Sequence, residues 1–100
     1  MKVEIAEATF LDENELVTLA QLAERSGLSE EELRELIESG AFSPLDASAW
    51  TFSSHCVVVA RTAYRIREEF ALDDTHALTV VVRLIQRIEA LRAQLRSGRR

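Results

Sequence analysis

The sequence is poor in the residues from which disulfides, metal sites and membrane helices are built. Among its 100 residues there is one cysteine, so no disulfide framework can form, which fits a reducing compartment such as the cytoplasm. One cysteine and two histidines are too few for a zinc site, and three glycines make no phosphate-binding loop. No apolar run approaches the roughly 20 residues of a membrane helix, and the N-terminus lacks the apolar stretch of a signal peptide. We therefore expect a cytoplasmic protein without a cofactor, a metal site or a membrane contact.

His55 and Cys56 are the one neighbouring pair that suggests nucleophilic catalysis. Neighbours in a helix point about 100° apart, so this imidazole and this thiol would not meet. A nucleophile, a base and an orienting group are not all available in the chain. We therefore expect no enzymatic activity, and we expect Cys56 to be a small buried apolar residue.

Charge is distributed unevenly along the chain. The net charge is −5, but residues 1–55 hold twelve acids and three bases (−9), whereas residues 56–100 hold five acids and nine bases (+4). The length and an apolar fraction of 47% predict a single folded domain over residues 1–100. An acidic first half and a basic second half suit a charged protein partner, although the same pattern also fits a solvated surface.

Two short amphipathic helices are predicted over residues 16–40, with the spacing of a helix-turn-helix. Thr18 is placed to cap the first helix, and Gly27 stands where a left-handed residue would end it. Ser29 and Glu32 then form a capping box at the start of the second helix. The core-facing residues predicted from helical spacing are Leu19, Leu22, Ala23, Leu33, Leu36 and Ile37.

Short extended segments are predicted on both sides of this unit. Residues 1–15 are expected to form a strand or a loose arm. Residues 41–53 are expected to form a small hairpin, or β-wing, whose first strand contains Pro44 and must therefore be an edge.

Two longer helices complete the chain. The first is predicted over residues 54–70, with Ser53 or Ser54 as its cap, and the second over residues 73–96. The expected apolar face of the first is Val59, Ala63, Ile66 and Phe70. The predicted fold class is mainly α, a winged helix-turn-helix with a small β-wing followed by two longer helices.

The last predicted helix carries an apolar heptad seam. Its members are Ala77, Val81, Leu84, Ile88, Leu91 and Leu95, separated by steps of four and three residues. Further apolar side chains widen the stripe in the first half of the helix, and one neighbouring helix cannot bury so wide a stripe. We therefore expect the first half to pack within the chain and the second half to help form a homodimer.

The order helix, turn, helix, wing, long helix, long helix resembles the MerR-type winged helix. Within that group the chain resembles the CbpM chaperone-modulator family. The resemblance is carried by residues 17–23, 27–33, 40–41, 50–52, 61–67 and 72–73. This similarity extends over nearly everything after Glu15. It implies that the protein binds the J-domain of a DnaJ-like co-chaperone of the CbpA type. It also implies inhibition, because the J-domain surface offered to the chaperone DnaK would be covered.

The charges of the predicted second helix argue against DNA binding independently of any family. Residues 29–39 carry five glutamates and one arginine, a net charge of −4. A helix that reads DNA needs bases to neutralise phosphates, and phosphates would here meet repulsion. We therefore expect no direct contact with nucleic acid.

Three glutamates of this helix form a candidate contact surface. Glu31, Glu35 and Glu38 are spaced i, i+4, i+7 and share one helix face. The resemblance implies a J-domain with a basic second helix, which these acids could attract and steer. The alternative is an ordinary solvated helix face, because charged helix faces are common.

Aromatic and basic side chains add further candidates. Trp50 and Phe52 point to the same side of a strand, where they could anchor a partner or fasten the wing to the core. Arg61 and Arg65 could pair with acids of a partner or with acids of the fold itself. The full predicted partner-binding set is Glu31, Glu35, Glu38, Trp50, Phe52, His55, Arg61 and Arg65.

The sequence thus predicts a chaperone modulator that binds a J-domain and inhibits its action with DnaK. One alternative is a transcription regulator of the MerR type, which would bind duplex DNA with an affinity that falls steeply with salt. The other is a generic dimeric adaptor, which would form no complex with a J-domain.

Overall fold

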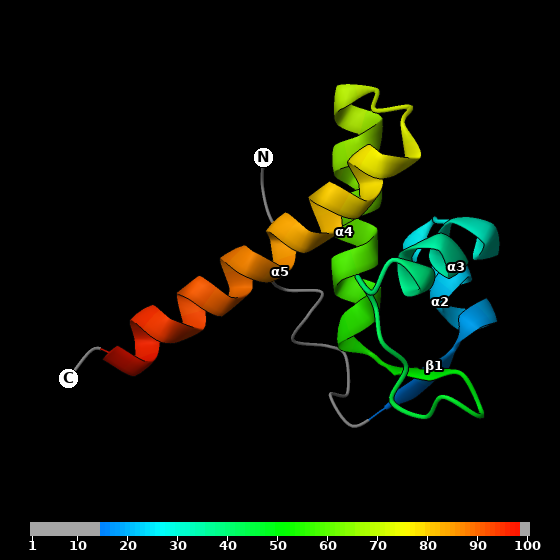
Figure 1. Ribbon diagram of the computed structural model, residues 1–100, viewed down its shortest axis with the longest axis horizontal. Helices are drawn as coiled ribbons and strands as arrows, with labels where there is room; N and C mark the ends of the chain where they lie inside the picture. The colour runs from blue at the N-terminus through cyan, green and yellow to red at the C-terminus, as the bar shows by residue number, and fades with distance from the viewer. Residues whose placement is uncertain (1–14, 99–100) are drawn as a thin grey trace.

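The computed structural model describes residues 15–98. In chain order they form β1 (Leu16–Thr18), α2 (Leu19–Ser26), α3 (Glu30–Glu38), β2 (Thr51–Ser53), α4 (His55–Phe70) and α5 (Thr75–Gly98). Figure 1 shows α2 and α3 on one side of α4, and α5 crossing α4 before its C-terminal half extends away from the other elements. The predicted class, mainly helical with a small sheet followed by two longer helices, is confirmed. The arm predicted for residues 1–15 lies outside the described residues except for Glu15.

The two helices of the helix-turn-helix begin at the predicted residues. Thr18 caps α2, because its hydroxyl accepts from the Gln21 amide at 3.2 Å while the Gln21 side-chain oxygen accepts from the Thr18 amide at 2.9 Å. Ser29 and Glu32 make the same reciprocal pair at the start of α3, at 3.0 and 2.9 Å. Each box satisfies amides that a helix start leaves without partners, so both predicted caps are confirmed.

The turn between these helices requires glycine at position 27 for two reasons. Gly27 has a φ of 96°, in the left-handed region, and its amide donates to the carbonyl of Ala23 at 3.1 Å. A Cβ at this position would lie 3.1 to 3.2 Å from ring atoms of Tyr64 on α4. The turn therefore places the backbone of the helix-turn-helix directly against α4.

The predicted β-wing is wrong in its strand pairing. β2 pairs antiparallel with β1 and not with residues 41–44, in the register Leu16 with Ser53, Val17 with Phe52 and Thr18 with Thr51. Within residues 39–50, the structure has one isolated bridge, from Asp46 to Thr51. The small sheet therefore joins the start of the helix-turn-helix to the start of α4.

Residues 41–44 are kept out of a strand by burial and by a side-chain turn. The amides of Ala41 and Phe42 both donate to the Leu36 carbonyl, and both side chains are buried. Farther along, the Asp46 carboxylate accepts from the hydroxyl and amide of Ser48, and these bonds hold the pKa of Asp46 below its usual range. The backbone in this region therefore bends around side chains instead of extending into a hairpin.

One core lies under the sheet and among α2, α3 and α4. Val17 and Phe52 face each other across the sheet, and both are fully buried. Its helical members include Leu19, Leu22, Leu33, Leu36, Val57, Val59, Ala60 and Ala63. Ala23 and Ile37 pack against this core only half-buried. The core-facing residues predicted for the helix-turn-helix are therefore confirmed.

α4 departs from its predicted face at the C-terminal end. Val59 and Ala63 are buried as predicted and Ile66 is half-buried, but Phe70 is 63% exposed. Phe70 belongs to the last turn of the helix, where the chain leaves through Ala71 in the left-handed region. No described element covers this turn, so the predicted place of Phe70 in the core is wrong.

The start of α4 lies next to the sheet. Ser54 occupies the position before the first helical residue, but its side chain makes no capping hydrogen bond. Its amide instead donates to the Glu15 carbonyl at 3.1 Å. The backbone that precedes β1 is thereby fastened to the beginning of α4.

α5 packs through a face next to the predicted heptad seam. Leu78 and Val82 are buried, and Val81 and Ile85 are half-buried against the same core. The later seam residues, Leu84, Ile88, Leu91 and Leu95, are 42 to 69% exposed. A heptad seam needs two helices that run nearly parallel, whereas α5 crosses α4 obliquely (Figure 1). The prediction that the first half of this helix packs within the chain is confirmed, and Val81 is the seam residue that packs there.

Candidate protein-binding surface

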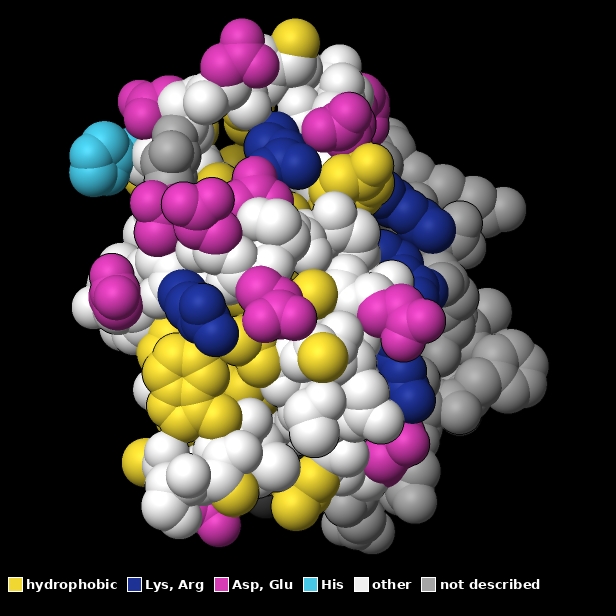
Figure 2. Space-filling model, turned by 90° about the vertical axis from the view of Figure 1, so that its right-hand side faces the viewer, with side chains coloured by type: hydrophobic (Ala, Val, Ile, Leu, Met, Phe, Trp, Pro, Cys, Tyr) yellow, Lys and Arg dark blue, Asp and Glu magenta, His cyan; other side chains and the backbone are white. Residues whose placement is uncertain are grey.

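The three predicted glutamates of α3 are all exposed to solvent. Glu31, Glu35 and Glu38 lie on the side of α3 opposite the buried Leu33 and Leu36. Figure 2 shows acidic side chains distributed over the face of the molecule that carries α2 and α3, beside an apolar patch with an arginine at its border. This face is therefore negatively charged and accessible, as a surface for a cationic partner must be.

The one base of α3 is engaged within the fold. Arg34 pairs with Glu30 one turn earlier, at 3.8 Å, and its guanidinium carbon lies 5.9 Å from the centre of the Trp50 ring. A cation over an aromatic face is attracted by the ring's electron density, typically by about 0.5–1 kcal/mol at exposed sites. Arg34 thus links Trp50 to α3. Its charge is used on Glu30 and not on the three exposed glutamates.

Trp50 and Phe52, predicted to point to the same side, have different roles. Phe52 is completely buried, whereas Trp50 is half-buried and precedes the strand. Their rings meet edge to face, with centres 6.4 Å apart and planes at 72°. Trp50 also has a φ of 53°, which is uncommon for a bulky residue and costs of the order of 1–3 kcal/mol. Phe52 therefore belongs to the core, and Trp50 is the aromatic residue available at the acidic face.

Arg61 of α4 is directed toward the end of α2. Arg61 donates from Nε and from a terminal nitrogen to the carbonyl of Arg25, at 3.1 and 2.7 Å. Arg25 lies in the last turn of α2, where carbonyls lack helical partners, so Arg61 fastens the end of α2 to α4. Arg65, one turn farther along α4, is exposed.

His55 is directed toward a different helix. Its Nε2 atom lies 3.0 to 3.1 Å from the two carboxylate oxygens of Glu89, in the second half of α5. His55 therefore links the first turn of α4 to α5. The structure shows it as part of the α4–α5 contact.

A second ion pair, missed by sequence reasoning, fixes the start of α3. One Glu32 oxygen accepts from the Ser29 amide in the capping box, and the other accepts from Arg67 of α4. Partial burial raises the pKa of Glu32, but the bonds from Ser29 and Arg67 outweigh this and leave it below its usual range. Because 35 residues separate Glu32 from Arg67, no local pattern could have revealed their contact.

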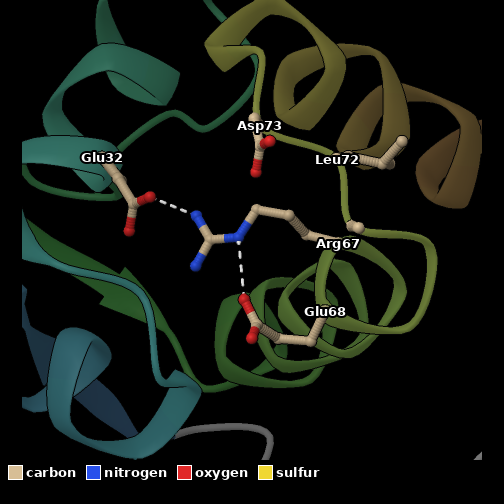
Figure 3. Close-up of a pocket in the computed structure, with 6 residues that line it drawn as sticks. Glu32, Arg67, Glu68, Leu72 and Asp73 are labelled. Atoms are coloured by element: carbon tan, nitrogen blue, oxygen red, sulfur yellow. Dashed lines mark hydrogen bonds and ion pairs between the residues drawn. The ribbon is translucent and has the colours of Figure 1, made fainter.

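Arg67 lies in a polar pocket between α3 and the end of α4. Its Nε atom pairs with Glu68 at 3.4 Å, and its guanidinium carbon lies 5.5 Å from the centre of the Tyr64 ring. The pocket has a volume of about 450 Å³ and is lined by Glu32, Arg67, Glu68, Ala71, Leu72 and Asp73. Figure 3 shows the Arg67 side chain reaching between Glu32 and Glu68, with Asp73 on the opposite wall. These contacts hold α3 at a defined orientation on α4.

The described residues offer little for catalysis or metal binding. Cys56 is half-buried, and burial raises the pKa of its thiol even though Ser53 contacts it at 3.8 Å. Residues 15–98 contain no group of three or more histidine, cysteine or acidic side chains placed to hold a metal ion. None of the helices in that range is both long and apolar enough to span a membrane.

Comparison with known proteins places the chain in a family. Residues 17–100 match the sequence model described as MerR HTH family regulatory protein. A chaperone modulatory protein CbpM from Citrobacter koseri is 31% identical over 81 residues, which cover 79% of each chain. The CbpM proteins of Escherichia coli O1:K1 and of Shigella boydii serotype 18 are 36% identical over 58 residues. Those 58 residues span 56% of this chain and 57% of each relative. The chain therefore belongs to the CbpM family of chaperone modulatory proteins, within the MerR-type helix-turn-helix proteins.

Proposed function

We propose that the protein modulates a chaperone system by binding the J-domain of a DnaJ-like co-chaperone of the CbpA type and blocking its action with DnaK. The observation that carries the proposal is the exposed acidic face of α3, formed by Glu31, Glu35 and Glu38, with Trp50 beside it. The names of the CbpM relatives support a role in chaperone modulation. The basic J-domain helix implied by the family resemblance is the target that this charge suits.

The two components of the face would contribute differently to binding. Exposed glutamates at the rim raise the rate of encounter with a cationic surface and set its orientation, but add little affinity. Affinity comes mainly from a few well-packed anchors, among which tryptophan and arginine are enriched. Trp50, held against Arg34 and Phe52, has its ring already oriented before a partner arrives. Binding would therefore order little at this site, which lowers its entropic cost.

DNA binding, the main alternative, is disfavoured by the same helix. α3 occupies the place of a recognition helix, but it presents five glutamates and its one arginine already contacts Glu30 and Trp50. Specific DNA binding relies on bases that release counterions from phosphates. The matching family model is described as a regulatory protein. That description does not change the electrostatic repulsion between α3 and the phosphates of DNA.

We also propose that the protein acts in the cytoplasm and without enzymatic activity. The relatives are named as modulatory and regulatory proteins. The one thiol, Cys56, has a raised pKa, which leaves little of the reactive thiolate at neutral pH. A chain with a single, half-buried cysteine also suits a reducing compartment.

A titration of the full chain against an isolated J-domain of the CbpA type tests the central proposal. We expect saturable binding that Glu31→Lys with Glu35→Lys weakens by about tenfold or more, mainly through a slower association rate. A matched control is Glu24→Lys with Glu69→Lys, two exposed acids on α2 and α4. The control has the same net charge and should bind nearly as the unchanged protein does.

Three outcomes would contradict the proposal. If the wild-type chain did not bind the J-domain, the proposed partner would be wrong. If both double variants weakened binding equally, net charge and not the α3 face would be responsible. Salt-sensitive, sequence-selective binding of duplex DNA by the wild-type protein would favour the transcription regulator instead.

We further propose that the second half of α5 forms a homodimer. Its seam residues Ile88, Leu91 and Leu95, with Leu84 just before them, are exposed at heptad spacing, and a second copy of the same seam could cover them. Leu84→Glu with Leu91→Glu should convert the protein to a monomer in sedimentation at increasing concentration. Leu45→Glu is the control, since Leu45 is 66% exposed but lies outside α5. A wild-type protein that stays monomeric at high concentration would contradict the dimer.

A further inference from the structure

An apolar groove separates α4 from α5 on a face that the helix-turn-helix does not use, and it shares Ile88 with the heptad seam. Its volume is about 170 Å³, and its lining residues are Val58, Val59, Thr62, Ile66, Ile85, Ile88, Glu89 and Arg92. The side chains at its floor are mostly branched aliphatic groups, so an apolar side chain is the natural occupant. The hydrogen bond between His55 and Glu89 lies at the end of the groove nearest the start of α4.

The rim of this groove is positively charged. Glu89 is engaged by His55, whereas Arg92 makes no hydrogen bond or ion pair with any residue in the range 15–98. Arg96 follows one turn later on the same side of α5. α5 as a whole holds four arginines and one glutamate, a net charge of +3. A segment that fills the groove would therefore be favoured if it combined apolar and acidic side chains.

The segment formed by residues 1–14 has this composition. It contains four acids and one lysine, a net charge of −3, together with Val3, Ile5, Phe10 and Leu11. Its charge is thus opposite to that of α5, and Phe10 is its largest apolar side chain. Opposite charges on the two surfaces would guide the segment to the groove and fix its direction.

The position of Glu15, the residue that follows this segment, brings the segment within reach of the groove. Because β1 and β2 are antiparallel, the chain that precedes Leu16 leaves the sheet at the end where α4 begins. There the Glu15 carbonyl accepts from the Ser54 amide at 3.1 Å. Thr62, in the middle of the groove, lies eight residues along α4 from Ser54, a rise of about 12 Å. The five residues from Glu15 back to Phe10 span up to about 17 Å when extended, which is sufficient.

We propose that residues 1–14 of the same chain dock in the groove between α4 and α5, with Phe10 among its aliphatic side chains and the acids of the segment at Arg92 and Arg96. This contact would cover the apolar surface beside His55, including the side of Ile88 that lines the groove, and leave Leu84, Leu91 and Leu95 open to a second copy. It would also tie the crossing of α5 over α4 to the N-terminal segment. The proposal stands independently of J-domain binding.

Contacts between Phe10 and the groove are the direct test. In the full chain with labelled methyl groups, nuclear Overhauser effects should connect the Phe10 ring with methyls of Ile66 and Ile85. These signals should vanish in Phe10→Ala and remain in Phe70→Ala, since Phe70 is exposed at the far end of α4. The absence of such signals in the wild-type protein would overturn the proposal. A sample of mixed labelled and unlabelled copies that shows them only between chains would also overturn it.

Charge reversal at the rim provides a second, independent readout. Arg92→Glu should speed amide hydrogen exchange in residues 1–14 by about tenfold, since the acids of the segment would then meet repulsion. Arg87→Glu makes the same change on another side of α5, away from the groove, and should leave this exchange unchanged. Equal exchange in both variants, or no protection of the segment in the wild-type protein, would contradict the docking.

Discussion

The acids of α3 and the arginines of α4 lie on adjacent helices but are used in opposite ways. Glu31, Glu35 and Glu38 point into solvent, whereas Arg61 and Arg67 are directed back into the fold. Arg61 holds the end of α2 and Arg67 holds the start of α3. The difference shows that an arginine is used within the fold where packing brings it against the end of a neighbouring helix, whether it meets a backbone carbonyl, as Arg61 does, or a carboxylate, as Arg67 does. Charges that face away from every neighbouring helix remain available to a partner.

Substitutions at the junction between the helix-turn-helix and α4 should lower the stability of the protein the most. Gly27→Val places a β-branched side chain at a φ of 96° and within 3.2 Å of the Tyr64 ring. We expect a loss of about 2–4 kcal/mol in the free energy of unfolding, measured by urea denaturation. Gly98→Val is the control, because a Cβ at Gly98 would meet nothing within 4 Å. An equal effect of both changes would show that close approach to α4 is unimportant.

Removing an inward-directed arginine should have the next largest effect. Arg67→Met keeps much of the side-chain volume but leaves Glu32 partly buried without its cationic partner. We expect a loss of about 1–3 kcal/mol, since both side chains are less than one third exposed but not fully desolvated. Arg87→Met, at an exposed position of α5, should cost less than about 0.5 kcal/mol. If the two losses were equal, the Glu32–Arg67 pair would not fasten α3 to α4.

The Glu32–Arg67 pair should make the stability of the protein depend on pH in the acidic range. The pKa of Glu32 is lower in the folded protein than its ordinary value of 4.5, so the folded state favours the carboxylate. This contribution is fully present above about pH 4.5 and is lost as the pH falls through the lowered pKa. Glu32→Gln should therefore lose less stability than the wild-type protein between pH 6 and pH 3, measured by thermal unfolding. Asp46, whose pKa is also lowered, is common to both proteins and cancels in the comparison.

The outward-directed acids should have the smallest effect on stability. Glu31→Lys with Glu35→Lys should change the free energy of unfolding by less than about 1 kcal/mol, since exposed helix charges contribute only a few tenths of a kcal/mol each. Glu31 lies in the first turn of α3, where a positive charge is slightly unfavourable, so a small loss is expected. A loss as large as that of Arg67→Met would show that these glutamates stabilise the fold and are not reserved for a partner.

Local features were predictable because their causes lie within a few residues. The capping boxes at Thr18 and Ser29, the left-handed Gly27 and the acidity of α3 all follow from neighbouring side chains and backbone groups. The predicted wing failed because the partner of β2 is β1, more than 30 residues earlier in the chain. The local signal marked the strand at residues 51–53 but could not select its partner.

The candidate surface was predicted in part for the same reason. The exposure of Glu31, Glu35 and Glu38 follows from helical periodicity, which also places Leu33 and Leu36 in the core. The roles of Arg61 and Arg67 depend on which helix ends lie beside α4, and that is known only once the helices pack. Trp50 and Phe52 share a pattern in the sequence, yet one is half-buried and the other completely buried.

The sequence by itself determined the helices, the caps of α2 and α3 and the sign of charge on each helix, since these depend on interactions over one or two helical turns. The tertiary structure alone decided that β1 pairs with β2, that Arg61 and Arg67 face inward, and that α5 crosses α4 instead of running along it. Those outcomes depend on contacts between distant segments. Such contacts form only where burial and hydrogen bonding together offset the cost of ordering the chain.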